Sequence, residues 1–391
     1  MQTGLTHAQT CTRCLLGNAD TEFIEFNEQG VCSYCTGYDK TIRAFNSHTD
    51  SPEKRLNALV SVMKTRGRGK KYDCILGLSG GTDSSYLAWW ANQQGLRPLV
   101  VHMDNGWNSE LAVKNIENIC TRLGWDLHTH VIDWEEFREL QLSYLRAGVI
   151  DIEALTDHAI YAIIYKLARK YRIKYTLSGY NYATEAIMPK GWTYNKRDYE
   201  NIQDIYRHFG RGKTIKTFPH LSFWGSLWYH WFLKIENINV LNYLPYQKEE
   251  AKKIISAELG WRDYGGKHFE SVFTKFYQIY ILPLKFGVDK RKCHLSNLIC
   301  SGQITKEQAL EEMNKPLYDQ SEINEEKHFV LKKFGLSEQE FEEIMKGPVR
   351  SHESFRTNKE LWRRYFKVVG AINAFLKAIR LKKHGAGNYS E

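Results

Sequence analysis

Glycine and hydroxyl side chains gather in one stretch of the chain, Ser79-Gly80-Gly81-Thr82-Asp83-Ser84-Ser85. The apolar run before it is typical of a buried strand, and the residues after it have the pattern of a helix. A glycine-rich turn between strand and helix presents backbone N–H groups and the positive end of the helix dipole to one anion. The stretch therefore predicts a phosphate-binding loop, in which Asp83 orients the hydroxyls or binds Mg²⁺. The alternative at this point is a plain glycine turn with a capping serine.

Four cysteines near the N-terminus have the spacing of a metal site. Cys11-x-x-Cys14 and Cys32-x-x-Cys35 form two pairs. Each pair suits a tight turn, and four thiolates suit tetrahedral Zn²⁺. A site with four protein ligands has no open position, so we expect a structural zinc rather than a catalytic one. A redox dithiol or an iron–sulfur cluster remains the alternative.

The elements that position the loop follow an alternating pattern. Short apolar strands are expected at 74–78, 98–103, 127–132 and 175–177, and helices at 84–94, 110–123 and 157–171. Strands joined by helical crossovers predict an α/β fold with a doubly wound parallel sheet, whose ligands bind beyond the carboxyl ends of the strands. Before this unit, Ser51-Pro52 has the form of a helix start.

Polar residues follow two of the other expected strands. Asp104 and Asn105 come after the second strand, where contact with adenosine or Mg²⁺ competes with a plain Asn-Gly turn. Gly179 follows the fourth strand and permits close approach of backbone. We assign Asp104, Asn105 and Gly179 to cofactor binding. Asn181 and Glu185, just beyond, are assigned to the substrate, although an exposed glutamate at a helix start explains Glu185 equally well.

A second polar concentration lies at 262–296. Two basic clusters flank an apolar, aromatic segment, so a hairpin of the two halves would place the basic residues on one rim. Such a rim suits leaving pyrophosphate or the diphosphate of a sugar nucleotide, and solvated surface charge is the alternative. We assign catalytic roles to Asp83, Ser84, Lys267, His268, Lys290 and Arg291, and substrate binding also to Glu270 and Lys292.

The composition describes a globular chain with an anionic partner. The chain has 391 residues, a net charge of +9 and eight cysteines. Positive charge suits a nucleotide, a sugar phosphate or a nucleic acid, and unpaired cysteines suit the cytosol and metal binding. No apolar segment is long enough to span a bilayer and no signal-type N-terminus is seen, so we expect a cytoplasmic protein.

The stretch 220–233 is unusually aromatic. A core or subunit-contact helix, stacking on a base or sugar, and a helix at a membrane interface all remain open for it. The tail after 303 has a helical, charged pattern and ends in a basic helix, which is expected to pack or to form a subunit surface.

Several motifs together resemble one family. The loop resembles the pyrophosphate-binding (PP) loop of N-type ATP pyrophosphatases, and 244–260 resembles the segment that closes their ATP domain. With the zinc ribbon, Asp104-Asn105-Gly106-Trp107, Gly179-Tyr180-Asn181, 265–271 and 284–292, the chain resembles the N-acetyl sugar amidotransferases of bacterial surface-polysaccharide synthesis, of the WbpG and PseA type. The resemblance covers about 8–320. It implies a zinc ribbon at 1–45, an ATP pyrophosphatase domain at 46–260 and a helical region at 261–391 that completes the substrate cleft.

The resemblance also implies a reaction. ATP would adenylate the acetamido oxygen of a nucleotide-linked sugar, and ammonia would displace AMP to leave an acetamidino group. The expected cofactors are ATP, Mg²⁺ and structural Zn²⁺. The sequence offers no glutaminase nucleophile, since residue 2 is Gln2 and Cys11 belongs to the zinc set. The resemblance therefore implies a separate glutaminase subunit with a cyclase-like barrel partner, and no nucleic acid.

A tRNA-thiolating enzyme is the alternative function. It would share the phosphate loop, the zinc pairs and the basic charge. Such enzymes usually need cysteines near the ATP, and the four that remain, Cys74, Cys120, Cys293 and Cys300, are expected away from it.

Overall fold

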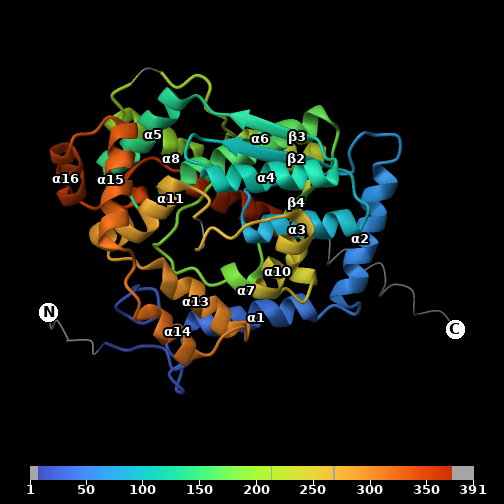
Figure 1. The fold of residues 1–391 in the computed structure, drawn as a ribbon, viewed down its shortest axis with the longest axis horizontal. Helices are drawn as coiled ribbons and strands as arrows, with labels where there is room; N and C mark the ends of the chain where they lie inside the picture. Colours follow the sequence, from blue (N-terminus) through green and yellow to red (C-terminus); the bar gives the residue numbers. More distant parts are fainter. Residues whose placement is uncertain (1–7, 213, 267–268, 372–391) are drawn as a thin grey trace.

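A parallel five-stranded sheet lies at the centre of the structure, a computed structural model that describes residues 8–212, 214–266 and 269–371 (Figure 1). The strand order is β3-β2-β1-β4-β5. The strands are β1 (Cys74–Gly77), β2 (Pro98–Asp104), β3 (Leu127–Val131), β4 (Tyr175–Ser178) and β5 (Glu236–Asn239). The chain winds outward from β1 in one direction and then returns to place β4 on the other side. The carboxyl ends of β1 and β4 therefore flank the point where the order reverses, which is where ligands of such sheets bind.

Helices cover both faces of the sheet because its central strands, β2, β1 and β4, are buried on both sides. Ile75 and Leu99 pack in the core with α5 (Trp134–Ala147) and α6 (Ala154–Lys170). Leu76 and Val100 point the other way, into a core with four further helices. These are α2 (Pro52–Arg66), α3 (Thr82–Gln93), α4 (Glu110–Leu123) and α10 (Lys248–Leu259). The doubly wound parallel sheet expected from the sequence is thus confirmed.

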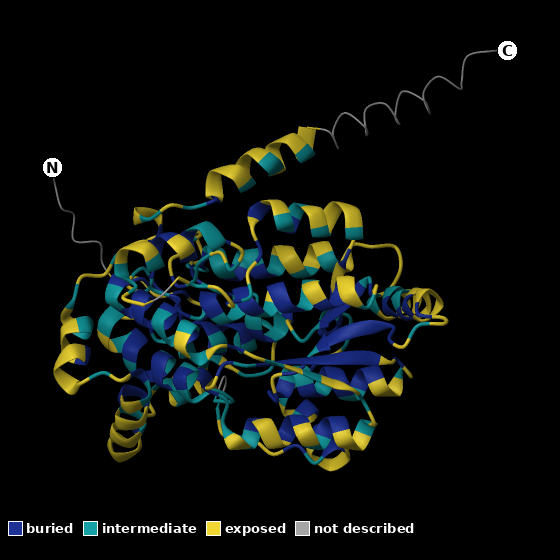
Figure 2. Ribbon diagram, turned by 90° about the horizontal axis from the view of Figure 1, so that it is seen from above, coloured by how far each residue is buried: buried dark blue, intermediate teal, exposed yellow. Residues whose placement is uncertain are grey.

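The remaining elements surround the carboxyl edge of the sheet and one end of the molecule (Figure 1). They include α1 (Ser33–Asn46), α7 (Tyr182–Glu185), α8 (Tyr199–Phe209), α9 (Phe223–Trp228), α11 (Val272–Phe276), α12 (Leu282–Phe286), α13 (Lys290–Cys300), α14 (Lys306–Met313), α15 (Gln320–Phe334) and α16 (Glu338–Lys346). π-Helical turns follow α9 at Tyr229–Leu233 and α11 at Tyr277–Ile281, and short 3₁₀ turns lie at Val240–Tyr243 and His352–Ser354. A last helix runs over 359–371 along the edge of the molecule, with exposed residues over most of its length (Figure 2).

The N-terminal cysteine segment packs against α13 and α14. The backbone N–H of Leu15 donates to Ser296 Oγ at 3.2 Å, and Lys306 Nζ donates to the carbonyl of Cys11 at 2.7 Å. Lys292 pairs with Asp20 at 2.6 Å. The four cysteines share one apolar core with α5, α6, α11, α12, α13, α15 and α16. The three domain boundaries proposed from the sequence stay a prediction.

Two elements of the sheet layer were not anticipated. Strand β5 reads Glu-Asn-Ile-Asn, and only Ile238 of it is buried, so it lacks both an apolar run and an alternating pattern. Helix α5 begins after Asp133, whose carboxylate accepts from the N–H of Glu136 at 3.0 Å. That N-cap is a recognisable signal. No helix within the described residues is long and apolar enough to cross a membrane.

Candidate functional site

The loop after β1 is held in shape by hydrogen bonds of its own serine hydroxyl groups. Ser79 Oγ lies 3.1 Å from Ser84 Oγ and accepts from the N–H of Gly81 at 3.2 Å. Ser84 Oγ also donates to the carbonyl of Gly81 at 3.2 Å. Gly80 has φ of +80°, and a Cβ there would lie 2.6 Å from the carbonyl oxygen of Ala112, so only glycine fits. The strand, the glycine turn and the start of the helix follow one another in the order found in phosphate-binding loops.

The first residue after β4 lies in close contact with this loop. A Cβ on Gly179 would lie 3.1 Å from both the carbonyl carbon of Asp83 and the nitrogen of Ser84. The neighbours are backbone atoms, which cannot swing aside. The close approach expected for Gly179 is therefore present, and its partner is the phosphate-binding loop itself.

Three aromatic side chains from the second half of the chain hold the loop, and none was assigned from the sequence. The Tyr246 hydroxyl donates to Asp83 Oδ1. Trp261 Nε1 donates to the carbonyl of Gly80 at 2.8 Å, and the Tyr264 hydroxyl accepts from the N–H of Thr82 at 3.2 Å. Burial and the nearby Asp83 charge raise the pKa of Tyr246, so its phenol keeps the proton that it donates.

The loop forms one wall of a cleft of about 1640 Å³. Opposite walls come from 263–266, from 269 and 270, and from the start of α13, so segments more than a hundred residues apart meet here. The predicted site residues that line the cleft are Ser79, Gly81, Thr82, Asp83, Ser84, Gly179, Glu185, Glu270, Lys290 and Arg291. Lys267 and His268 lie outside the residues that the structure describes.

The two cations at the start of α13 are both held by acidic neighbours. Lys290 Nζ pairs with Glu153 at 3.2 Å. Burial alone would lower the pKa of Lys290, but Glu153 and Asp151 raise it above the ordinary value, so the ammonium keeps its charge at the cleft. Arg291 pairs with Asp289 at 2.9 Å and donates to the carbonyl of Lys315 at 2.8 Å, which fixes the guanidinium in place.

The structure places other assigned residues away from the cleft lining. Ser85 is fully buried on α3, and Asn181 caps α7 by accepting from the N–H of Thr184 at 2.9 Å. Lys292 is engaged with Asp20, as described above. Gly80 lies on the side of the loop that faces Ala112, away from the cleft, and its positive φ determines the path of the loop. For Asn181 and Lys292 the described contacts are structural, and the buried Ser85 Oγ has no hydrogen-bond partner within the described residues.

Asp104 and Asn105 likewise organise the turn after β2. Asp104 Oδ1 accepts from the N–H of Gly106 at 2.9 Å, and Asn105 Oδ1 accepts from the N–H of Trp107 at 3.1 Å. The Trp107 ring is buried and stacks 5.1 Å from Phe273 of α11. The Asp-Asn-Gly-Trp sequence therefore joins the sheet to the second half of the chain, and neither carboxylate nor amide lines the cleft.

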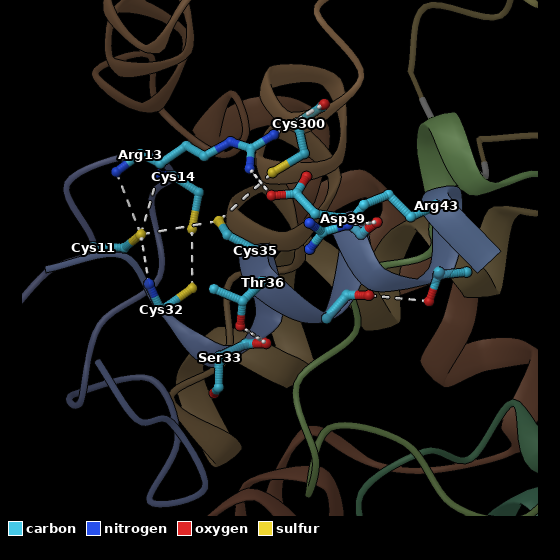
Figure 3. A network of polar contacts seen from close by, with 12 residues as sticks. Cys11, Arg13, Cys14, Cys32, Ser33, Cys35, Thr36, Asp39, Arg43 and Cys300 are labelled. Carbon is cyan, nitrogen blue, oxygen red and sulfur yellow. Dashed lines mark hydrogen bonds and ion pairs between the residues drawn. The ribbon is translucent and has the colours of Figure 1, made fainter. Parts of the chain in front are cut away.

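The four N-terminal cysteines converge as the spacing predicts. All four are buried, and their sulfur atoms lie within 4.8 Å of one another. Cys11 Sγ is 3.9 Å from Cys35 Sγ, and Cys14 Sγ is 3.7 Å from Cys32 Sγ (Figure 3). Zn–S bonds of about 2.3 Å in a tetrahedron put sulfurs about 3.8 Å apart. The donor set and its spacing fit one zinc ion.

Comparisons with known proteins match the two halves of this cleft separately. Residues 73–181, with the loop and Gly179, match the queuosine biosynthesis protein QueC, a PP-loop family. Residues 270–369, with Lys290 and Arg291, match the WbpG-like C-terminal domain of LPS biosynthesis proteins. The chain thus carries a PP-loop segment followed by a WbpG-like C-terminal domain. The PP-loop family is one of ATP-using enzymes and implies ATP and Mg²⁺ as cofactors.

Individual relatives of this chain are distant. The tRNA(Ile)-lysidine synthase of Chlamydia pneumoniae is 31% identical over 103 residues, which span 26% of this chain and 28% of that protein. An uncharacterised protein of Methanocaldococcus jannaschii is 22% identical over 314 residues, 78% of this chain and 93% of the relative.

Solved structures overlap with the chain only in part. NMN synthetase from Francisella tularensis is 18% identical, with a TM-score of 0.27, over 34% of this chain and 56% of that one. A 4-thiouridine synthetase bound to RNA and ATP is 20% identical, with a TM-score of 0.27, over 51% of this chain and 45% of that one. At this level of similarity no functional argument rests on them.

Proposed function

We propose that the chain is the synthetase subunit of an ATP-dependent amidotransferase, which converts an N-acetyl group of a nucleotide-linked sugar into an acetamidino group. One observation carries the proposal. The PP-loop and the first turn of α13, which belongs to the segment matched by the WbpG-like C-terminal domain, line the same cleft. The expected ATP site and a family-specific wall would therefore face one another. The volume of about 1640 Å³ exceeds that of ordinary ligand pockets, as two nucleotide-sized substrates require.

In the first step the acetamido oxygen attacks the α-phosphorus of ATP, and pyrophosphate leaves. An amide oxygen leaves poorly by itself, so this activation precedes any substitution at the carbon. The backbone N–H groups of the loop and the hydroxyls of Ser79 and Ser84 would receive the charge that develops on the pyrophosphate. Bound Mg²⁺ would neutralise phosphate charge, and Asp83, held by Tyr246 at the cleft wall, is suited to hold it.

In the second step ammonia attacks the activated carbon, and AMP departs with the former acetamido oxygen. The product carries nitrogen in place of that oxygen. Lys290, charged and fixed by Glu153, would bind a diphosphate group of one of the two nucleotides. A separate glutaminase with a cyclase-like barrel subunit would supply the ammonia, because free NH₃ in neutral water is mostly protonated.

The direct experiment supplies the purified chain with Mg·ATP, ammonium chloride and a panel of nucleotide-linked N-acetyl sugars. AMP and pyrophosphate should form in equal amounts, and the sugar should lose one mass unit. Glutamine alone should not support the reaction until a glutaminase partner is added. AMP formation from glutamine by the chain alone would contradict the assignment of a separate glutaminase.

Thiolation of tRNA is a second candidate because of one cysteine. Cys293 lies in the cleft lining, so the expectation that all four remaining cysteines lie away from the site is wrong for this residue. Its Sγ donates to the carbonyl of Lys290 at 3.1 Å. Cys293→Ser should keep sugar-dependent AMP formation if the amidotransferase proposal holds, whereas labelled sulfur in tRNA, lost in this variant, would favour thiolation.

A further inference from the structure

Exposed apolar side chains gather on two segments that lie outside the cleft, residues 223–233 and the helix at 359–371. On the first, Trp224 is 71% exposed and Phe232 is 74% exposed. On the second, Phe366 is 62% exposed. The set, which we name the aromatic patch, consists of Trp224, Trp228, Trp231, Phe232, Leu361, Phe366 and Val368.

Ring contacts join the two segments into one surface. Phe223 lies 5.1 Å from Trp224 on its own segment and 4.8 Å from Trp362 on the C-terminal helix. Trp362 in turn lies 5.7 Å from Phe366. Exposed Trp224 and exposed Phe366 are thus the two ends of one row of rings. A contiguous exposed patch of this kind marks an interaction surface.

The surroundings of the patch are basic. Residues 221–235 contain no Asp or Glu, and the described part of the C-terminal helix, 359–371, contains four Lys or Arg against one Glu. The Arg169 guanidinium lies 5.1 Å from the centre of the Trp228 ring. Glu360, the acidic residue of this helix, is paired with Arg363 and Arg364 at 2.7 and 3.0 Å. The surface that carries the rings is therefore positive.

We propose that the aromatic patch docks the protein on a membrane surface that contains anionic lipids. Trp and Phe bury their rings at the headgroup boundary, and Lys and Arg next to them attract anionic headgroups. A second copy of the chain fits less well, because a twofold contact would bring two positive surfaces together. The inference does not depend on the reaction proposed above.

The test is flotation of the full chain with vesicles. Vesicles of phosphatidylcholine mixed with phosphatidylglycerol should carry the protein upward, and vesicles of phosphatidylcholine alone should carry much less. Trp231→Ser with Phe232→Ser should reduce partitioning roughly tenfold or more. Arg363→Gln with Lys367→Gln should reduce it by roughly fivefold per charge at low salt, without touching the rings.

Val131→Ser is the matched control, since Val131 is 69% exposed on β3, outside the patch. It should bind vesicles as the parent does. Equal binding to both vesicle types, no binding, or undiminished binding of the Trp231/Phe232 variant would overturn the proposal. So would self-association of the parent that the same variant abolishes, because the patch would then be an interface between copies.

Discussion

A Cβ atom on Gly179 would lie 3.1 Å from the backbone nitrogen of Ser84. Gly179 directly follows β4, and Ser84 lies in the first turn of α3, just after the loop that follows β1. The backbone segments beyond the two strands that flank the reversal of the sheet order are therefore in close contact. Gly179→Ala should displace the loop by a few tenths of an ångström. Because reactions of this kind depend on alignment, we expect about a 100-fold loss of AMP formation.

Gly77→Ala is the control for that change. Gly77 lies on β1, yet a Cβ there meets nothing within 4 Å and its φ is not positive. Turnover within about twofold of the parent is expected for this variant. Parent-like turnover of Gly179→Ala would show that the close approach is not needed.

Loss of the loop side chains should remove activity without unfolding the chain. Asp83→Ala and Ser84→Ala should each reduce AMP formation at least about 100-fold, with zinc content and circular dichroism unchanged. Tyr246→Phe removes only the hydroxyl group that donates to Asp83, so a smaller loss of about tenfold is expected. Wild-type turnover in both alanine variants would exclude the loop as the pyrophosphate site.

The cysteine cluster should bind one zinc ion per chain. Removal of a ligand in Cys11→Ser should release the metal and strongly destabilise the fold, since binding free energy here is on the order of 10 kcal/mol. Cys300 Sγ lies only 3.6 Å from Cys35 Sγ (Figure 3), but it is not among the four converging sulfurs. Cys300→Ser should therefore retain zinc by metal analysis, and loss of zinc in that variant would redefine the ligand set.

His158 should make stability depend on pH. Both ring nitrogens are used in the neutral form, since Nδ1 lies 2.8 Å from the carbonyl of Lys196 and Nε2 accepts from the N–H of Leu221 at 3.0 Å. Burial lowers its pKa from 6.5 to about 4. As pH falls below 6.5 the unfolded chain gains a proton here that the folded chain does not, so stability falls down to about pH 4.

The size of that effect can be isolated by substitution. Between pH 7 and pH 5, this residue should contribute about 2 kcal/mol to the decrease in the free energy of unfolding. In urea titrations, the free energy of unfolding of His158→Gln should decrease by about 2 kcal/mol less between pH 7 and pH 5 than that of the parent. This difference should hold whatever the variant's own stability at pH 7. An unchanged pH dependence in the variant would mean that His158 is protonated when folded.

The sequence predicts those parts of the fold and the site whose signals are local in the chain, and it misses those that depend on contacts between distant residues. The loop and the strands β1, β2 and β4 have local signals, namely a glycine turn and apolar runs, and the structure places them within about a residue of the expected bounds. Strand β3 also lies at the expected place, although its residues are exposed or half-buried. Ser85 does not line the cleft, which the motif could not foretell because it gives residue types but not the direction of a side chain at the start of a helix. Tyr246 and Trp261 were not assigned because their contacts with the loop join residues far apart in the chain, which spacing cannot reveal.

The transfer of oxygen tests the central claim most directly. A nucleotide-linked N-acetyl sugar labelled with ¹⁸O in the acetamido carbonyl would be incubated with the chain, Mg·ATP and ammonium chloride, and the products analysed by mass spectrometry. The adenylation account predicts that the label appears in the phosphate of AMP and that the sugar product carries none. Label in inorganic phosphate with ADP as the nucleotide product, or label retained in the sugar, would contradict it.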